Sequence, residues 1–202
     1  MWRSSASVLM LWLAGCAFLP GPVNRGSIQT YVLMTEEAGA WSSVPGRGPR
    51  VRVSPPQAWP GYNSPRIAYV KRPYEVSYYA YNEWVDTPSR LIEPLLIRAL
   101  ERSGQFSAVL PESSSGVAGL RLDTEIVSFH HEYLTNPSQG RVALHAQLVD
   151  LTNGDILGTK TFEAVTPAAS PDPYGGVKAI SGSLEHVLSE IVAFCRKAIK
   201  GG

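Results

Sequence analysis

The sequence predicts a single-domain α+β protein in which a mostly antiparallel sheet of about eight strands carries two amphipathic helices. Several runs of strand length alternate between apolar and polar residues, or are rich in β-branched and aromatic side chains. Two longer runs repeat apolar residues at helical spacing. The runs follow the order four strands, helix, four strands, helix, so both helices are expected to pack on one sheet.

The first 15 residues have the organisation of an export signal. Arg3 precedes a short apolar core, Val8–Leu13, which is far shorter than the ~20 residues that span a bilayer. Small residues then lead to Cys16 in the order Leu-Ala-Gly-Cys, as in a bacterial lipoprotein signal. The pattern predicts a diacylglyceryl group on the Cys16 thiol and removal of residues 1–15. The alternative is a buried N-terminal helix with an incidental cysteine.

Residues 16–27 are predicted to form a lipidated tether, because their Pro-Gly-Pro stretch does not suit a helix or a strand interior. Two or more acyl chains hold a protein stably on a membrane, whereas one chain binds only marginally. Ala17 follows the cysteine, and an Asp at that position retains lipoproteins of enteric bacteria in the inner membrane. We therefore expect an anchor in the outer membrane, with the folded part, residues 28–200, facing the periplasm.

The first half of the domain contains four runs with the composition of strands. They are Ile28–Met34, Arg50–Val53, Arg66–Val70 and Tyr74–Tyr81. The polar segment Glu36–Pro49 and the aromatic-bearing segment Pro56–Pro65 are expected to be loops, and Arg72-Pro73 a tight turn.

A first helix is predicted at Pro88–Ser103. Thr87 is a good N-cap residue, and Pro88 suits the first helical position. The apolar positions that form one face are Leu91, Ile92, Leu95, Leu96, Ala99 and Leu100. Pro94 removes one backbone hydrogen bond, so we expect a local kink there, and Gly104 is expected to end the helix in a left-handed conformation.

The second half of the domain predicts four further strands and a second helix. The strands are Phe106–Leu110, Leu120–Phe129, Val142–Leu151 and Ile156–Val165. Alternation places Ser128 on the apolar face of the second of these strands. The Asn153-Gly154 pair predicts a hairpin between the last two. Thr166–Gly176, with three prolines, is expected to be a loop before a long amphipathic helix, Val177–Ile199, whose apolar stripe includes Cys195.

Charge and cysteine content exclude two classes of feature. The 18 basic and 17 acidic residues give a net charge of +1, which argues against a nucleic-acid partner, since that partner requires a basic surface. The two cysteines are Cys16 and Cys195. Because Cys16 is assigned to lipid, no intrachain disulfide is expected, and Cys195 is interpreted as a small buried apolar residue.

The sequence contains no pattern that predicts catalysis, a metal site or a cofactor. His130 and His131 are adjacent on a predicted strand and so point to opposite faces. Neither they nor His145 is accompanied by a cysteine or carboxylate cluster that would complete a metal site. No serine lies in a Gly-x-Ser-x-Gly elbow, and the glycine pairs lack the spacing of a phosphate-binding loop. The protein is therefore expected not to be an enzyme.

Three aromatic residues are candidates for an interaction surface. Trp59 and Tyr62 lie in a loop rich in proline and glycine, and Trp84 follows a tyrosine-rich strand. For Trp84, a place in the hydrophobic core is the alternative.

A set of loosely defined motifs resembles the ABC-type transport auxiliary lipoprotein family, of the paraquat-inducible protein C kind. The motifs are Tyr31–Leu33, Ile67-Ala68-Tyr69, Asn82-Glu83-Trp84, Pro88 with Ser103-Gly104-Gln105-Phe106, Leu122, Ile126, Phe129, Ala143, Leu148-Val149-Asp150, Gly154 and Phe162. Their specificity lies in their order behind the lipoprotein signal. Val85 departs from the pattern, because many relatives have Ala after the tryptophan.

The resemblance implies a function that composition does not. Such proteins are outer-membrane lipoproteins encoded beside ABC transporter parts and mammalian-cell-entry (MCE) domain proteins, and those systems move lipids between the two membranes. The auxiliary lipoprotein is expected to dock the MCE assembly at the outer membrane as a ring-shaped homo-oligomer. Two alternatives remain: a periplasmic binding module for a small apolar ligand, and a structural envelope lipoprotein.

Overall fold

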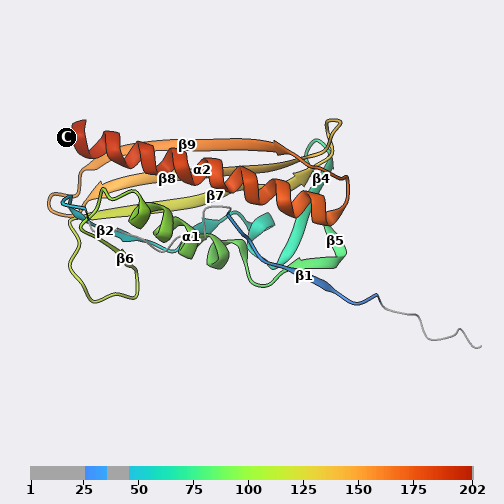
Figure 1. Cartoon of the computed structure of the whole chain (residues 1–202), viewed down its shortest axis with the longest axis horizontal. Helices are drawn as coiled ribbons and strands as arrows, with labels where there is room; N and C mark the ends of the chain where they lie inside the picture. The colour runs from blue at the N-terminus through green and yellow to red at the C-terminus, as the bar shows by residue number, and fades with distance from the viewer. Residues whose placement is uncertain (1–25, 36–45, 202) are drawn as a thin grey trace, which may run out of the picture.

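The computed structural model describes residues 26–35 and 46–201, in which two helices pack on a nine-stranded sheet (Figure 1). The elements in chain order are β1 (Gln29–Tyr31), β2 (Arg50–Val53), β3 (Gln57–Ala58), the 3₁₀ turn η2 (Pro60–Tyr62), β4 (Arg66–Arg72), β5 (Glu75–Trp84), α1 (Pro88–Arg102), β6 (Ala108–Pro111), β7 (Leu120–Glu132), β8 (Gln139–Asp150), β9 (Ile156–Pro167) and α2 (Pro173–Gly201). The predicted α+β class is confirmed. The sheet is mixed, however, so the prediction of a mostly antiparallel sheet is wrong.

The long strand β7 organises the sheet. One of its edges pairs antiparallel with β8, and β8 pairs antiparallel with β9 across the predicted Asn-Gly turn. The other edge is shared end to end by the short strands β2, β3 and β4, which all run parallel to β7. Pairs β1–β5 and β2–β6 are also parallel, and the β4–β5 hairpin is antiparallel.

The geometry of β7 explains the parallel pairing. The chain from β2 to β4 advances along one edge of β7 without reversing, so its strands cannot form hairpins with one another. Parallel neighbours need a long connection, and β6 reaches its place beside β2 only after the chain has passed through β3, β4, β5 and α1. The local sequence pattern identifies each strand but does not reveal which partner it meets.

Helix α1 forms largely as its sequence predicts. Pro88 occupies its first turn, and the helix continues through Pro94. Gly104 has a φ of 61°, which is the left-handed conformation expected of a residue that ends a helix. The predicted capping bond is absent, because the Thr87 side chain makes no hydrogen bond to the helix; instead the Thr87 amide donates to the Asp86 carboxylate, at 2.7 Å.

Helix α2 is longer than its apolar stripe predicts and lies across β7, β8 and β9 (Figure 1). It begins at Pro173 because Asp172 accepts a hydrogen bond from the Gly175 amide at 2.8 Å, which caps the first turn. The predicted loop at Thr166–Gly176 is therefore wrong at both ends, since β9 extends to Pro167. The fully or nearly fully buried stripe residues are Ile180, Leu184, Val187, Leu188, Ile191 and Cys195.

A bulge in β7 changes which of its side chains face the core. Pairing with β8 shifts register between Ile126 and Ser128. Ile126 is fully buried before the shift, and Phe129 is 1% exposed after it. The expected strict alternation, which placed Ser128 on the apolar face, therefore ends at the bulge.

Candidate functional site

Trp59 presents its ring to solvent, as expected of an interaction residue. Its side chain is 48% exposed and lies just before η2. The indole Nε1 donates a hydrogen bond to Glu125 Oε1 on β7, at 2.9 Å. This bond holds a large amphipathic ring against the sheet while leaving half of it accessible to a partner.

Tyr62 lies in the core and not on the surface. The side chain is 8% exposed, and its hydroxyl is 2.9 Å from His130 Nδ1. Burial raises the pKa of the Tyr62 hydroxyl. The two rings are stacked, with 6.0 Å between centroids. Tyr62 therefore fixes η2 to β7 and has no ring available to a partner.

Trp84 is also a core residue, in agreement with the alternative interpretation of its sequence position. It is 1% exposed and packs on Phe129, with 5.5 Å between the ring centroids. The three aromatic residues that the sequence singles out thus do not form one surface. Trp59 is the one among them whose ring reaches solvent.

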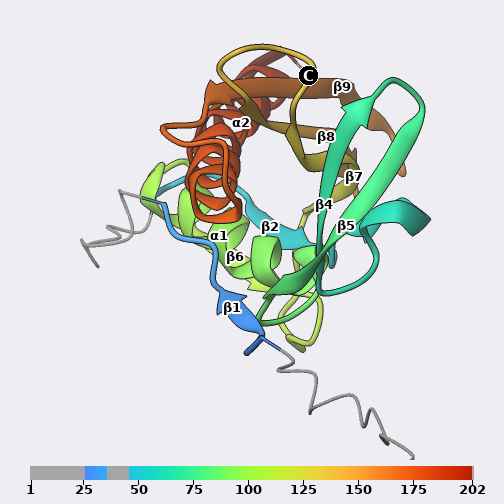
Figure 2. The ribbon, with the colours of Figure 1, turned by 90° about the vertical axis from the view of Figure 1, so that its right-hand side faces the viewer.

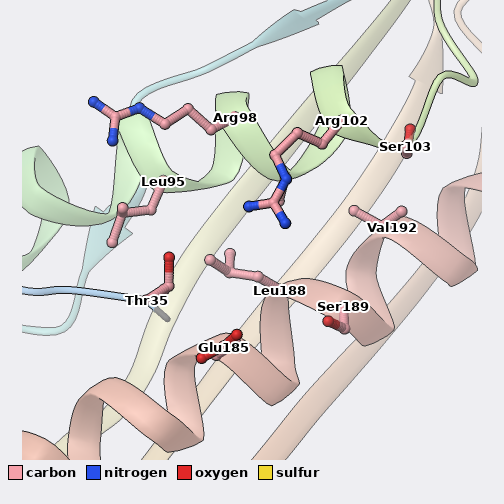
Figure 3. Close-up of a pocket in the computed structure, with 10 residues that line it drawn as sticks. Thr35, Leu95, Arg98, Arg102, Ser103, Glu185, Leu188, Ser189 and Val192 are labelled. Carbon is pink, nitrogen blue, oxygen red and sulfur yellow. The ribbon is translucent and has the colours of Figure 1, made fainter. Parts of the chain in front are cut away.

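A groove lies between α1 and α2, and the sequence did not predict it (Figure 3). Its volume is 260 Å³. The residues that line it are Thr35, Leu95, Arg98, Ala99, Arg102, Ser103, Glu185, Leu188, Ser189 and Val192. The Arg102 side chain extends from α1 towards α2, whereas Arg98 points along α1 (Figure 3). The sequence signal for this feature is the spacing of these two arginines, which places both on one side of the helix.

A buried polar network joins the end of β7 to its neighbours. His131 Nδ1 is 2.8 Å from the Tyr79 hydroxyl, and His131 Nε2 is 2.9 Å from Ser138 Oγ. The Tyr79 hydroxyl is 2.7 Å from that of Tyr133, which donates to the Pro171 carbonyl. Burial lowers the pKa of His131 to about 4, so the imidazole is neutral at physiological pH.

This network has a structural role and not a catalytic one. Ser138 is 5% exposed and His131 is fully buried, so a substrate has no access to the Ser–His pair. A nucleophile must reach the reacting carbon, which this burial prevents. The network instead satisfies polar groups that would otherwise be buried without a partner, and it connects β5, β7 and the segment before α2.

A second polar cluster lies on the other side of the same strand. Arg141 donates to Glu132 through Nε at 2.7 Å and through Nη2 at 3.2 Å, and it also pairs with Glu163 on β9. The hydrogen bonds from Arg141 lower the pKa of Glu132, which also accepts from Gln139 at 2.6 Å. This cluster fastens β7 to β8 and β9 through charged groups.

The remaining sequence predictions concern metal ions and cysteines. Across residues 26–35 and 46–201, no three His, Cys, Asp or Glu side chains gather in a way that could hold a metal ion. Cys195 is fully buried, and burial raises the pKa of its thiol to about 12. Cys16 lies outside the described residues, so its lipidation stays a prediction. In the same described part, no helix combines the length and apolar character needed to cross a bilayer.

The fold and these sites define a class of protein: an α+β domain whose polar clusters hold strands together and whose outer features are an exposed tryptophan and a charged groove. Within this class, the chain belongs to the family of ABC-type transport auxiliary lipoprotein components, whose sequence model matches residues 31–192. The resemblance stated from the sequence is thereby confirmed. As a member of this lipoprotein family, the protein is an auxiliary component of an ABC transporter. Family membership implies a role other than catalysis.

Solved structures share the fold. Protein XCC0632 from Xanthomonas campestris is 23% identical, with a TM-score of 0.72, over 84% of this chain and 96% of that chain. The hypothetical protein CT253 from Chlamydia trachomatis is 12% identical, with a TM-score of 0.54, over 77% of this chain and 99% of that chain. At these identities the likeness concerns the fold alone. No curated protein matches the chain.

Proposed function

We propose that this protein is the outer-membrane lipoprotein of an MCE/ABC-type intermembrane lipid transport system, and that it docks the periplasmic MCE assembly at the outer membrane. The observation that carries the proposal is the family match over residues 31–192, behind a lipoprotein signal that ends at Cys16. Ala17 supports the outer membrane as the destination. In this role the domain binds its partners and catalyses no reaction.

A docking role requires an accessible surface, and Trp59 is the best-supported part of it. Exposed tryptophans that become buried on binding often dominate the energy of an interface. The hydrogen bond to Glu125 restrains the indole before a partner arrives, so less side-chain entropy is lost on binding. We propose that the Trp59 ring contacts the MCE-domain protein.

The test is capture of the purified MCE-domain protein by the detergent-solubilised, lipidated protein. Trp59→Ala should weaken capture by about 30-fold, which corresponds to a hot spot of about 2 kcal/mol. Tyr174→Ala is the matched control, because Tyr174 is 60% exposed on α2 and should leave capture unchanged. Tyr62 is unsuitable for this test because it is buried. Equal capture by wild type and Trp59→Ala would exclude this contact.

The groove between α1 and α2 gives little support to the alternative of a module for small apolar ligands. Such a site is expected to be enclosed and mostly apolar, with few polar groups. Arg98, Arg102 and Glu185 line this groove, and no tyrosine or tryptophan does.

We also propose that the protein docks as a homo-oligomer, which the family resemblance implies. Light scattering of the solubilised, lipidated protein should give a mass that is a multiple of the protomer mass. A monomer mass at micromolar concentration would contradict this part of the proposal.

A further inference from the structure

An exposed apolar surface lies where the folded chain begins. The side chains that form it are Ile28, Val32, Met34, Tyr81 and Val85, and each is between 51% and 67% exposed. We refer to these five residues as the β1–β5 patch. Single exposed apolar side chains are normal, but a contiguous group on one face marks a contact surface.

Strand register brings four of the five patch residues together. β1 runs parallel to β5, with Gln29 opposite Asn82 and Tyr31 opposite Trp84. Extending this register by one residue at each end places Ile28 beside Tyr81 and Val32 beside Val85. The Val85 amide donates to the Tyr31 carbonyl at 2.8 Å, which supports the extension beyond Tyr31. Two neighbouring apolar pairs therefore lie side by side.

All five residues point away from the core. Successive side chains along a strand face opposite sides of the sheet. Leu33 and Trp84, which alternate with patch residues, are 8% and 1% exposed and belong to the hydrophobic core. β1 is the last strand at one edge of the sheet, on the opposite side of the molecule from β9 (Figure 2). The patch thus forms the outer face of an edge.

The length of chain before β1 indicates what covers the patch. Ile28 follows the predicted lipidation site, Cys16, by twelve residues. An irregular tether of that length, as its Pro-Gly-Pro stretch predicts, has an average span of about 20 Å. Because β1 is the first element after the tether, a tether of this length keeps β1 within about 20 Å of the acyl chains.

The charge pattern indicates how the patch would bind. The polar residues among the patch positions are Thr30 and Glu83, and Arg66 lies opposite Glu83 in the β4–β5 hairpin. One acid and one base leave no net positive charge to attract anionic lipid. Any bilayer contact here must therefore be hydrophobic, with Tyr81 at the level of the headgroups.

We propose that the β1–β5 patch rests on the phospholipid bilayer that holds the acyl chains of Cys16, so that the anchor both tethers and orients the domain. The inference rests on the proposed lipidation of Cys16. It places β9, which lies on the opposite side of the molecule from β1 (Figure 2), away from the membrane.

The test uses the full mature, lipidated protein in phosphatidylethanolamine vesicles that contain brominated lipid. Cys195 is buried and Cys16 carries lipid, so Val32→Cys can be labelled selectively with a fluorophore. Asn153→Cys, in the β8–β9 turn at the far end of the sheet (Figure 1), is the reference label. The label at position 32 should be quenched several-fold more strongly than the label at 153. Quenching should need no anionic lipid and persist in about 0.5 M salt, which screens charges.

Two substitutions separate the patch from general surface effects. Val85→Lys in the labelled Val32→Cys chain should reduce quenching at least two-fold. Val117→Lys should not, since Val117 is 79% exposed in the connection between β6 and β7.

Other outcomes overturn the proposal and identify its weak step. A protein that floats with the vesicles but shows equal quenching at both positions is lipidated without bilayer contact at the patch. A protein that does not float with the vesicles lacks the anchor, which refutes the lipidation as well. Two results together would show that a second copy covers the patch. Unlabelled Val32→Cys chains would form disulfide-linked pairs, and the fluorophore on labelled Val32→Cys chains would not be quenched.

Discussion

At the scale of single residues, a distant polar partner decides whether an aromatic side chain is exposed. Trp59 and Tyr62 lie three residues apart around the same short turn, η2. Tyr62 turns inward because its hydroxyl meets His130, which lies 68 residues later in the chain. Sequence could predict that this loop carries functional aromatics but could not separate the two, because the partner that buries Tyr62 is set by the fold.

His131 should make the stability of the protein depend on pH. Its pKa is lowered from 6.5 to about 4 in the folded protein, mainly by burial. The unfolded chain therefore takes up this proton at a higher pH than the folded chain does. The stabilising contribution is complete above about pH 6.5 and is lost progressively as the pH falls towards 4.

The measurement is urea unfolding of wild type and His131→Gln at several pH values between neutral and mildly acidic. For wild type, this group should lower the free energy of unfolding by up to about 1.4 kcal/mol per pH unit in that window. His131→Gln should be less stable at neutral pH, because its bonds to Tyr79 and Ser138 are altered, and should have a shallower slope. Equal slopes for the two proteins would show that His131 does not titrate as its burial implies.

At the scale of elements, the sequence predicts which segments form strands but not how they pair. β2 occupies its predicted bounds, and β8 buries the alternating residues expected of it. The parallel alignment of β2, β3 and β4 along β7 could not be predicted, because register between residues far apart in the chain leaves no local pattern. The start of α2 was predictable: Asp172 followed by Pro173 is a recognised helix start, which the apolar stripe alone does not include.

The contact between α2 and β8 depends on the absence of a side chain at Gly140. A Cβ atom added there would lie 2.2 Å from the Ile180 amide nitrogen and 2.3 Å from the Ala179 carbonyl carbon, both in the α2 backbone. Backbone cannot rotate away as a side chain can. Gly140→Ala should therefore lower the free energy of unfolding by about 3 kcal/mol, as overpacking does in a tight core.

Chemical denaturation monitored by circular dichroism checks this prediction. Gly119→Ala is the matched control, because a Cβ atom there meets nothing within 4 Å. Its stability should differ from that of wild type by less than about 0.5 kcal/mol. Gly140→Ala with wild-type stability would mean that α2 and β8 are not in the close contact described.

At the scale of the whole molecule, the evidence for function comes from separate parts of the chain. The family match covers residues 31–192 of the folded domain, whereas the predicted lipidation signal lies before the described residues. The β1–β5 patch connects the folded domain with the predicted anchor, since it lies where the tether meets the domain. Sequence could not predict this patch, because alternating apolar residues around β1 and at the end of β5 look like core residues until the sheet shows which face is covered.

One measurement tests the central claim, that a lipid anchor on this domain docks an MCE assembly at the outer membrane. The envelope of the native host is fractionated for wild type, Cys16→Ser and Cys195→Ala, and both this protein and its MCE-domain partner are followed. Wild type and Cys195→Ala should be processed and should bring the partner into the outer-membrane fraction. Cys16→Ser should remain unprocessed and leave the partner out of that fraction. Normal processing of Cys16→Ser, or a partner that stays at the outer membrane without the anchor, would contradict the account.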